Sequence, residues 1–198
     1  MAGKYIVISG PLGSGKTTII NKLCERHKEW NKINETIIPA EKEYLSDAFK
    51  RQIWFYLNYK EKDENFIKYD KLNFADSCVM SGVLYVTAAF KTHKVSLADY
   101  DMLKRLFNSY SWKQPDLEIV IGASTEELIK RISMRQRNSK EALNENDIEF
   151  VDTVNKLFTD YAKNNEGLRN IIFLDTTKMA PDEVIAEVEK IISRNFPY

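Results

Sequence analysis

A short glycine-rich stretch near the N-terminus constrains the fold of this chain more than any other feature. "GPLGSGKT", residues 10–17, fits the pattern G-x-x-x-x-G-K-[ST]. It lies between a short apolar run, Tyr5–Ser9, and a helical pattern, Thr17–His27, as a phosphate-binding loop requires. Glycines let backbone N–H groups turn inward around phosphate oxygens, and the helix N-terminus adds partial positive charge. The stretch therefore predicts binding of a nucleoside triphosphate.

Two side chains of this loop have predicted roles of their own. Lys16 supplies a mobile cation for the outer phosphates, and the Thr17 hydroxyl can ligate Mg²⁺. The candidate ATP-binding residues are Gly10, Pro11, Leu12, Gly13, Ser14, Gly15, Lys16, Thr17 and Thr18. Such loops serve switches, motors and small kinases alike, so the reaction must be inferred from the rest of the chain.

Strand and helix patterns alternate along the chain. Apolar runs typical of buried parallel strands occur at Tyr5–Ser9, Thr36–Ile38, Leu72–Ala75, Leu117–Ile121 and Asn170–Leu174. Helical patterns lie between and after them, at Thr17–His27, Asp47–Lys60, Met80–Lys91, Asp147–Ala162 and Pro181–Asn195. Two more helices are expected after Ser96 and Ser124, because Ser96–Asp99 and Ser124–Glu127 have the pattern of capping boxes. This order predicts an α/β, three-layer P-loop fold with a five-stranded parallel sheet and helices on both faces.

Composition limits the functions to consider. The 198 residues suit one domain, and the chain carries 29 Lys+Arg against 29 Asp+Glu. We therefore expect no overall attraction to a nucleic acid polymer or to a membrane surface. Cys24 and Cys78 have no metal-binding or redox spacing. The chain shows neither a signal peptide nor a transmembrane span, so we expect a soluble, cytoplasmic protein.

Motifs of other nucleotide-binding classes are absent from the sequence. A GTPase switch needs a D-x-x-G turn and an N-K-x-D motif, and no Asp here is followed three residues later by Gly. The three Asn-Lys pairs all lack the following Asp. A motor needs a larger chain and a strand ending in paired acids. A small metabolic kinase fits the length better.

Arginines near residue 135 predict the lid that such a kinase needs to exclude water from the donor phosphates. "RISMRQRNSKEALNEN", residues 131–146, contains Arg131, Arg135 and Arg137. Arg131 and Arg135 are four apart, so they would share one helix face. Guanidinium groups there can neutralise charge on the transferring phosphoryl group. We expect the lid itself at about 135–147.

The candidate acceptor residues follow the second and third predicted strands. Glu41, with Glu43 as a spare, could accept a proton from an acceptor hydroxyl as a general base. Gln52, Phe55 and Tyr56 would share one helix face, where aromatic rings stack on a planar base and an amide reads its edge. Asp76 ends the third strand and is a candidate Mg²⁺ ligand.

The whole chain resembles the deoxynucleoside kinase and thymidylate kinase superfamily of P-loop kinases. "GPLGSGKTT" is similar to the phosphate loop of bacterial deoxynucleoside kinases, and "RISMRQRN" resembles their R-x-x-x-R-x-R lid. "AFKRQIWFYL", residues 48–57, resembles their helix with a base-reading glutamine, which implies that role for Gln52. "FADSCVMSGVLY", residues 74–85, aligns with a stretch usually written D-R-S, which implies that Asp76 lies near Mg²⁺. Relatives are often dimers, so the resemblance also implies a homodimer.

Other segments resemble thymidylate kinases, and some positions depart from both patterns. "QPDLEIVIGAS", residues 114–124, is similar to the Pro-Asp-Leu strand entry of thymidylate kinases, whose "REPG" signature is absent. The Arg that usually follows the acid is Ser77 here. An Arg that is often part of base selection in deoxynucleoside kinases is Tyr59 here, and the Asp expected six residues after Asp76 is Gly82. Tyr59 is kept among the candidate substrate-binding residues.

Three hypotheses follow from these residues. The first is Mg-ATP-dependent phosphorylation of a deoxynucleoside at its 5′-hydroxyl. The second is a thymidylate kinase, with dTMP as the acceptor and no need for a strong base. The third is a nucleotide-binding module that has lost efficient catalysis, motivated by Ser77 and Gly82.

Overall fold

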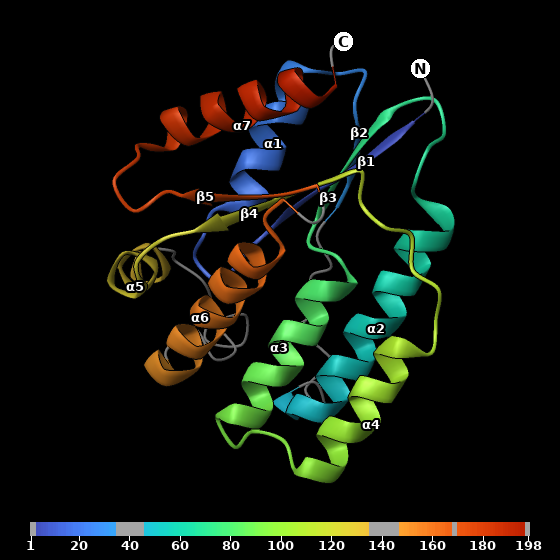
Figure 1. The fold of residues 1–198 in the computed structure, drawn as a ribbon, viewed down its shortest axis with the longest axis vertical. Coiled ribbons are helices and arrows are strands. Elements are labelled where there is room, and N and C mark those ends of the chain that lie inside the picture. The colour runs from blue at the N-terminus through green and yellow to red at the C-terminus, as the bar shows by residue number, and fades with distance from the viewer. Residues whose placement is uncertain (1–2, 35–45, 135–146, 168–169, 197–198) are drawn as a thin grey trace.

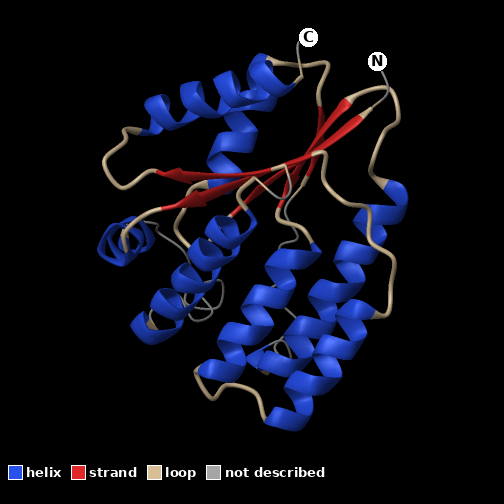
Figure 2. Cartoon of the chain, in the orientation of Figure 1, coloured by secondary structure: helices blue, strands red, loops and turns tan. Residues whose placement is uncertain are grey.

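Five parallel strands form the sheet, in the order β2-β3-β1-β4-β5. The computed structural model describes residues 3–34, 46–134, 147–167 and 170–196. The strands are β1 (Lys4–Ser9), β2 (Asn31–Ile33), β3 (Leu72–Asp76), β4 (Leu117–Gly122) and β5 (Ile171–Asp175). All of the strand pairs are parallel, so the carboxyl ends of the strands share one edge of the sheet (Figure 2). The predicted α/β class and five-stranded sheet are confirmed.

Helices cover both faces of this sheet, as predicted. They are α1 (Lys16–Arg26), α2 (Ala48–Asn65), α3 (Val79–Lys91), α4 (Leu97–Asn108), α5 (Thr125–Ser133), α6 (Ile148–Asn165) and α7 (Pro181–Asn195). Figure 1 shows α1 and α7 on one face and α2, α3, α4 and α6 on the other. Because α3 starts directly after β3 and packs against α2, α4 and α6, the large helical layer is built around it.

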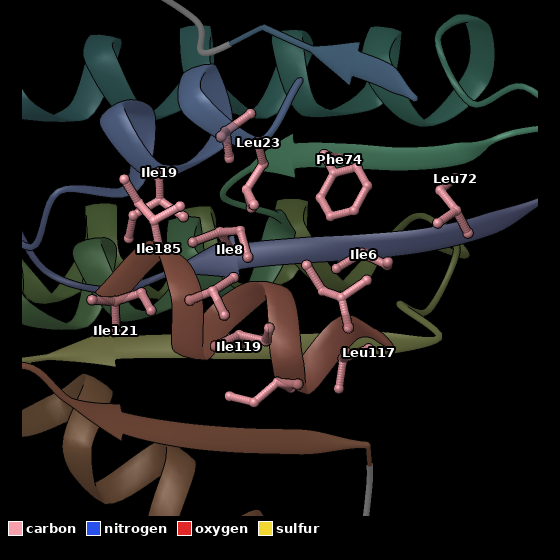
Figure 3. Packing of buried hydrophobic residues seen from close by; sticks show 14 of the residues in the cluster. Ile6, Ile8, Ile19, Leu23, Leu72, Phe74, Leu117, Ile119, Ile121 and Ile185 are labelled. Carbon is pink, nitrogen blue, oxygen red and sulfur yellow. The ribbon is translucent and has the colours of Figure 1, made fainter. Parts of the chain in front are cut away.

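The main core lies between the sheet and the α1–α7 layer. Ile6 and Ile8 of β1 point to this layer, as do Ile119 and Ile121 of β4, and all four are fully buried. They meet α1 and α7 side chains such as Leu23 (Figure 3). The intervening strand residues point to the opposite layer, because side chains alternate along a strand. This alternation decides which polar groups at the strand ends face α3 and α6.

The strand that occupies the second position in the chain lies upstream of the predicted one. Thr36–Ile38 lies outside the described residues, and the strand that pairs with β3 is β2. This edge strand has only three residues, of which Ile33 alone is buried. Asn31 and Lys32 are polar, so the sequence shows no apolar run at this strand. Asn31 Nδ2 donates to Asn73 Oδ1 at 2.7 Å.

The two predicted capping boxes have different outcomes. At α4 the box is complete: Ser96 Oγ accepts from the Asp99 N–H, and the Asp99 carboxylate accepts from the Ser96 N–H. At α5 only half of it forms. Ser124 Oγ accepts from the Glu127 N–H, but the Ser124 N–H donates to Thr177 Oγ1. The Glu127 side chain is directed elsewhere in the site.

Other sequence expectations concern metals, cysteines and membranes. Both cysteines are free thiols, Cys78 buried and Cys24 partly so. Within the described ranges, no group of three or more His, Cys, Asp or Glu side chains could hold a metal ion. No helix in the described part of the chain combines the length and apolar character needed to span a membrane.

Candidate active site

Gly10 and Gly13 of the loop after β1 occupy positions that only glycine fits. Gly10 has a φ of +146°, and a Cβ there would lie 2.2 Å from the carbonyl oxygen of Ile121. Gly13 has a φ of +79°, and its Cβ would lie 2.8 Å from the carbonyl oxygen of Leu128. Any other residue would be strained at such φ values and would clash with backbone. The loop therefore fits closely against the end of β4 and against α5.

The remaining loop residues surround Lys16. Its Nζ donates to the Pro11 carbonyl oxygen at 3.0 Å and to Ser14 Oγ at 3.4 Å. The ammonium group therefore lies over the loop, where a phosphate chain held by the loop would meet it. Pro11 and Ser14 are buried, whereas Leu12 packs against the α5 cluster and Thr18 is exposed.

The structure brings Thr17 and Asp76 together, as predicted for a pair of metal ligands. Asp76 is the last residue of β3 and is 3% exposed. Its Oδ2 accepts from Thr17 Oγ1 at 2.5 Å, and its Oδ1 accepts from Ser77 Oγ at 3.3 Å. Ser77 has a φ of +69°, which is rare outside glycine and marks a constrained turn at this strand end.

The donor set at this point suits Mg²⁺. A hydroxyl and a carboxylate offer hard oxygen ligands, and Mg²⁺ bound with a nucleotide takes few protein ligands because phosphates and waters supply the others. Thr17 and Asp76 could therefore serve as such ligands without the three-residue cluster that a dedicated protein metal site would need. They would hold the ion beside the loop that binds the phosphates.

Arg131 is anchored at the carboxyl end of β5. Its Nε donates to Glu127 Oε1 at 2.9 Å, its Nη1 to Thr176 Oγ1 at 3.0 Å and its Nη2 to the Thr176 carbonyl oxygen at 2.8 Å. The hydrogen bond from Arg131 lowers the pKa of the Glu127 carboxyl below its ordinary value. This ion pair explains why Glu127 does not complete the capping box.

Four further charged residues were predicted for the site. Glu41, Glu43, Arg135 and Arg137 lie outside the described residues, as does most of the predicted lid. Helix α5 ends at Ser133 with Met134 as its C-cap. Of the two arginines predicted to share a helix face, Arg131 lies on α5, and the shared face stays a prediction.

Gln52 lies on α2, on the side of the sheet that α3 covers. Its side chain is 4% exposed, and its Oε1 has no hydrogen-bond partner among the described residues. A buried polar atom without a partner costs about 1–3 kcal/mol, so such atoms are rare, and a bound ligand is one way to satisfy them. This observation supports the predicted role of Gln52 in reading the acceptor.

The aromatic residues predicted beside Gln52 occupy different surroundings. Tyr56 is buried and packs edge-to-face on Phe107 and Trp112, with ring centroids 5.5 Å away in each case. It belongs to the hydrophobic core between α2, α3 and α4. Phe55 and Tyr59 are half-buried and stacked on each other with their ring centroids 6.3 Å apart. Of the three rings, Phe55 and Tyr59 retain surface that a base could contact.

Gly82 on α3 is in contact with two of these rings. A Cβ at this position would lie 2.5 Å from Phe107 Cε1 and 3.0 Å from Tyr59 Cε2. The aromatic side chains of α2 and α4 therefore occupy the space into which a longer residue at 82 would project. The polar pair expected from the resemblance at positions 59 and 82 is replaced by ring packing.

Gly82→Ala should therefore lower the free energy of unfolding by about 1–3 kcal/mol through overpacking. At an exposed helical position the same change would raise it by about 1 kcal/mol. Denaturant unfolding of Gly82→Ala in the wild-type and Phe107→Leu backgrounds checks this, and the penalty should be smaller in the Phe107→Leu background. A Gly82→Ala protein more stable than wild type would contradict the packing described.

Sequence reasoning missed the partners of Arg131. Thr176 is fully buried, and its Oγ1 also donates to the Gly122 carbonyl oxygen at 2.9 Å. Thr176 directly follows β5. The only sequence signal for its role was that it is a polar residue at the carboxyl end of a predicted parallel strand. The Thr177 hydroxyl accepts from the N–H of Ser124, the N-cap of α5, and no sequence pattern indicated this contact.

The fold and the site define a class of protein. A parallel sheet with a phosphate loop after β1, an acid at the end of β3 and a tethered arginine on α5 is the architecture of a P-loop phosphotransferase. A model of the deoxynucleoside kinase family matches residues 6–194, and the chain belongs to this family. It is therefore a nucleoside kinase. No curated protein sequence matches it.

Solved structures share the fold at low sequence identity. Deoxyadenosine kinase from M. mycoides, with dCMP and dCDP bound, is 20% identical with a TM-score of 0.80, and the alignment covers 96% of this chain and 98% of that one. The same kinase with dATP is 21% identical with a TM-score of 0.75, covering 95% and 98%. Thymidylate kinase from Candida albicans is 20% identical with a TM-score of 0.72, covering 98% and 92%.

Proposed function

We propose that this protein transfers the γ-phosphoryl group of Mg-ATP to the 5′-hydroxyl of a deoxynucleoside. The bond between the γ-phosphorus and the β–γ bridging oxygen breaks, and a bond from that phosphorus to the 5′-oxygen forms. The proton of the hydroxyl passes to a base and ADP leaves. The buried, unpartnered Oε1 of Gln52 is the observation that carries the acceptor half of this proposal.

The described residues supply the donor half. Lys16 lies over the phosphate loop and would neutralise outer phosphate oxygens. Thr17 and Asp76 would hold Mg²⁺, which neutralises phosphate charge when bound. Arg131 is fixed by Thr176 and Glu127, so it would meet the nucleotide with little loss of side-chain freedom.

Residues outside the described ranges complete the proposal. Glu41 would accept the proton of the 5′-hydroxyl, and Arg135 and Arg137 would join Arg131 in compensating charge on the transferring group. On the acceptor side, Gln52 would bond the base edge, with Phe55 and Tyr59 against its ring and Tyr56 supporting them from the core. Assembly into a homodimer stays a prediction.

An acceptor panel tests the proposal. The M. mycoides kinase binds dATP and dCTP, so deoxyadenosine and deoxycytidine are the first candidates, followed by the other deoxynucleosides and dTMP. ADP release with Mg-ATP is followed for each acceptor. We expect turnover with at least one deoxynucleoside. Turnover with dTMP alone would indicate a monophosphate kinase, and ATP binding without turnover would indicate a binding module; either result overturns the proposal.

Gln52→Leu should have two opposite effects, one on stability and one on acceptor binding. Removing an unpartnered buried oxygen should raise the free energy of unfolding by about 1 kcal/mol, because the desolvation cost disappears. The lost hydrogen bond to the base should raise the acceptor KM about ten-fold. Thermal unfolding and steady-state kinetics measure the two effects.

Asn58→Leu is the matched control on the same helix. The Asn58 amide donates to the Trp54 carbonyl oxygen at 2.8 Å and has no predicted contact with the acceptor. Its acceptor KM should stay within two-fold of wild type. An unchanged KM in Gln52→Leu would remove Gln52 from the acceptor site.

A further inference from the structure

Strand β4 carries an acid inside the sheet. All six residues of β4, "LEIVIG", are buried, and Glu118 is 3% exposed. A parallel strand covered on both faces normally carries apolar residues throughout. Burying a carboxylate costs several kcal/mol unless hydrogen bonds compensate it. Glu118 is therefore a costly residue at this position, and its contacts explain what it provides.

The Glu118 carboxylate joins side chains from three other elements. Its Oε1 accepts from Ser9 Oγ at 2.6 Å, and its Oε2 accepts from Tyr161 Oη on α6 at 2.8 Å. The Cys78 thiol donates to Oε1 across 4.0 Å. Burial, and then the neighbouring Glu118, raise the pKa of the Cys78 thiol well above its ordinary value, which keeps the proton on sulfur.

Two of these partners belong to the segments that carry the site. Ser9 is the last residue of β1, directly before Gly10 of the phosphate loop. Cys78 is the N-cap of α3 and lies two positions after Asp76. The Thr17–Asp76 hydrogen bond joins the same two segments on the ligand side. Glu118 thus provides a second link between these two segments, through fully buried Ser9 and buried Cys78.

We propose that Glu118 is a positioning residue for phosphotransfer: by binding Ser9 and Cys78 it fixes the phosphate loop relative to Asp76. The inference rests on the proposed function, because only the use of Thr17 and Asp76 together makes their spacing matter. A small displacement of reacting groups costs much of the rate, up to about a hundred-fold for 1 Å. A carboxylate can accept from both hydroxyls and the thiol at once, whereas an amide has a single acceptor oxygen.

Glu118→Gln and Glu118→Leu separate positioning from folding. Glu118→Gln keeps the volume but loses one acceptor, and kcat should fall about ten-fold. Glu118→Leu removes the whole link, and kcat per folded molecule should fall about a hundred-fold. Glu118→Leu leaves the Ser9 and Tyr161 hydroxyls without this acceptor, which destabilises the folded state, so kcat is compared per folded molecule. The acceptor KM should change less than two-fold in both variants.

Tyr161→Phe and Ser9→Ala provide internal comparisons. Tyr161→Phe removes a hydrogen bond to the same carboxylate but leaves the links to Ser9 and Cys78, so kcat should stay within two-fold of wild type. Ser9→Ala should lower kcat, and adding Glu118→Gln to it should lower kcat by less than the product of the single effects. Equal effects of Tyr161→Phe and Ser9→Ala on kcat would overturn the positioning role.

A binding measurement distinguishes this inference from the proposed function. The affinity of a non-hydrolysable ATP analogue is measured with and without Mg²⁺. Glu118→Leu should lose most of the gain in affinity that Mg²⁺ provides, with the Mg²⁺-free affinity unchanged. Wild type inactive on every acceptor would refute the proposed function while this test still applies. Wild-type kcat and an unchanged Mg²⁺ effect in Glu118→Leu, with only a lower Tm, would overturn the positioning role.

Discussion

Lys16→Ala should lower kcat by about a hundred- to a thousand-fold, because it removes a preorganised cation from the phosphate charge that develops during transfer. Lys16 Nζ donates to Pro11 O and Ser14 Oγ of its own loop, and its side chain is half-buried. The free energy of unfolding should therefore change by less than about 1 kcal/mol. Steady-state kinetics and denaturant unfolding measure the two quantities.

Lys22→Ala is the matched control for this change. Lys22 is an exposed lysine on the same helix, α1, and lies away from the phosphate loop. Its kcat should equal that of wild type. If Lys16→Ala retained more than a tenth of the wild-type kcat, the loop would not be holding the transferred phosphate as described.

Asp76→Asn should have the second largest effect, with kcat lowered by about a hundred-fold. The amide has the same size but lacks the charge and one of the oxygens that would hold Mg²⁺ beside Thr17. Saturation with Mg²⁺ should require a several-fold higher concentration. The protein should stay folded, because the change removes a charge that is 3% exposed and keeps one acceptor for the Thr17 and Ser77 hydroxyls.

Asp70→Asn tests whether charge alone produces this effect. Asp70 is exposed in the turn that precedes β3 and has the same charge. Its kinetics and Mg²⁺ titration should match those of wild type. An Asp76→Asn enzyme with an unchanged Mg²⁺ requirement would show that the metal does not bind at this strand end.

The elements with strong local signals could be predicted from the sequence. The bounds of α7 were predicted as Pro181–Asn195, because proline in the first turn and an amphipathic pattern mark it clearly. The phosphate loop is equally local, since its glycines, lysine and threonine are adjacent in sequence. The position of β2 was not predicted, because a three-residue edge strand with two polar residues has no periodic pattern.

The contacts that assemble the site depend on residues far apart in sequence. Arg131 was predicted as one of three lid arginines, but its anchor Thr176 lies beyond α6 and β5 in the sequence. Glu118 was taken as part of an apolar run, although it binds Ser9 and Tyr161. At Gly82 the sequence showed only that an expected acid is absent. The contact of Gly82 with Phe107 depends on the packing of α3 on α4. No spacing rule predicts such pairs.

Transfer of labelled phosphate tests the central claim most directly. The protein is incubated with Mg²⁺, ATP labelled at the γ-phosphate and either deoxyadenosine or deoxycytidine, and the products are separated. We predict that the label appears on the 5′-oxygen of the deoxynucleoside in proportion to the ADP formed, and that Lys16→Ala forms this product at least about a hundred-fold more slowly. Label found only in inorganic phosphate, or transferred only to dTMP when that is supplied, would contradict deoxynucleoside kinase activity.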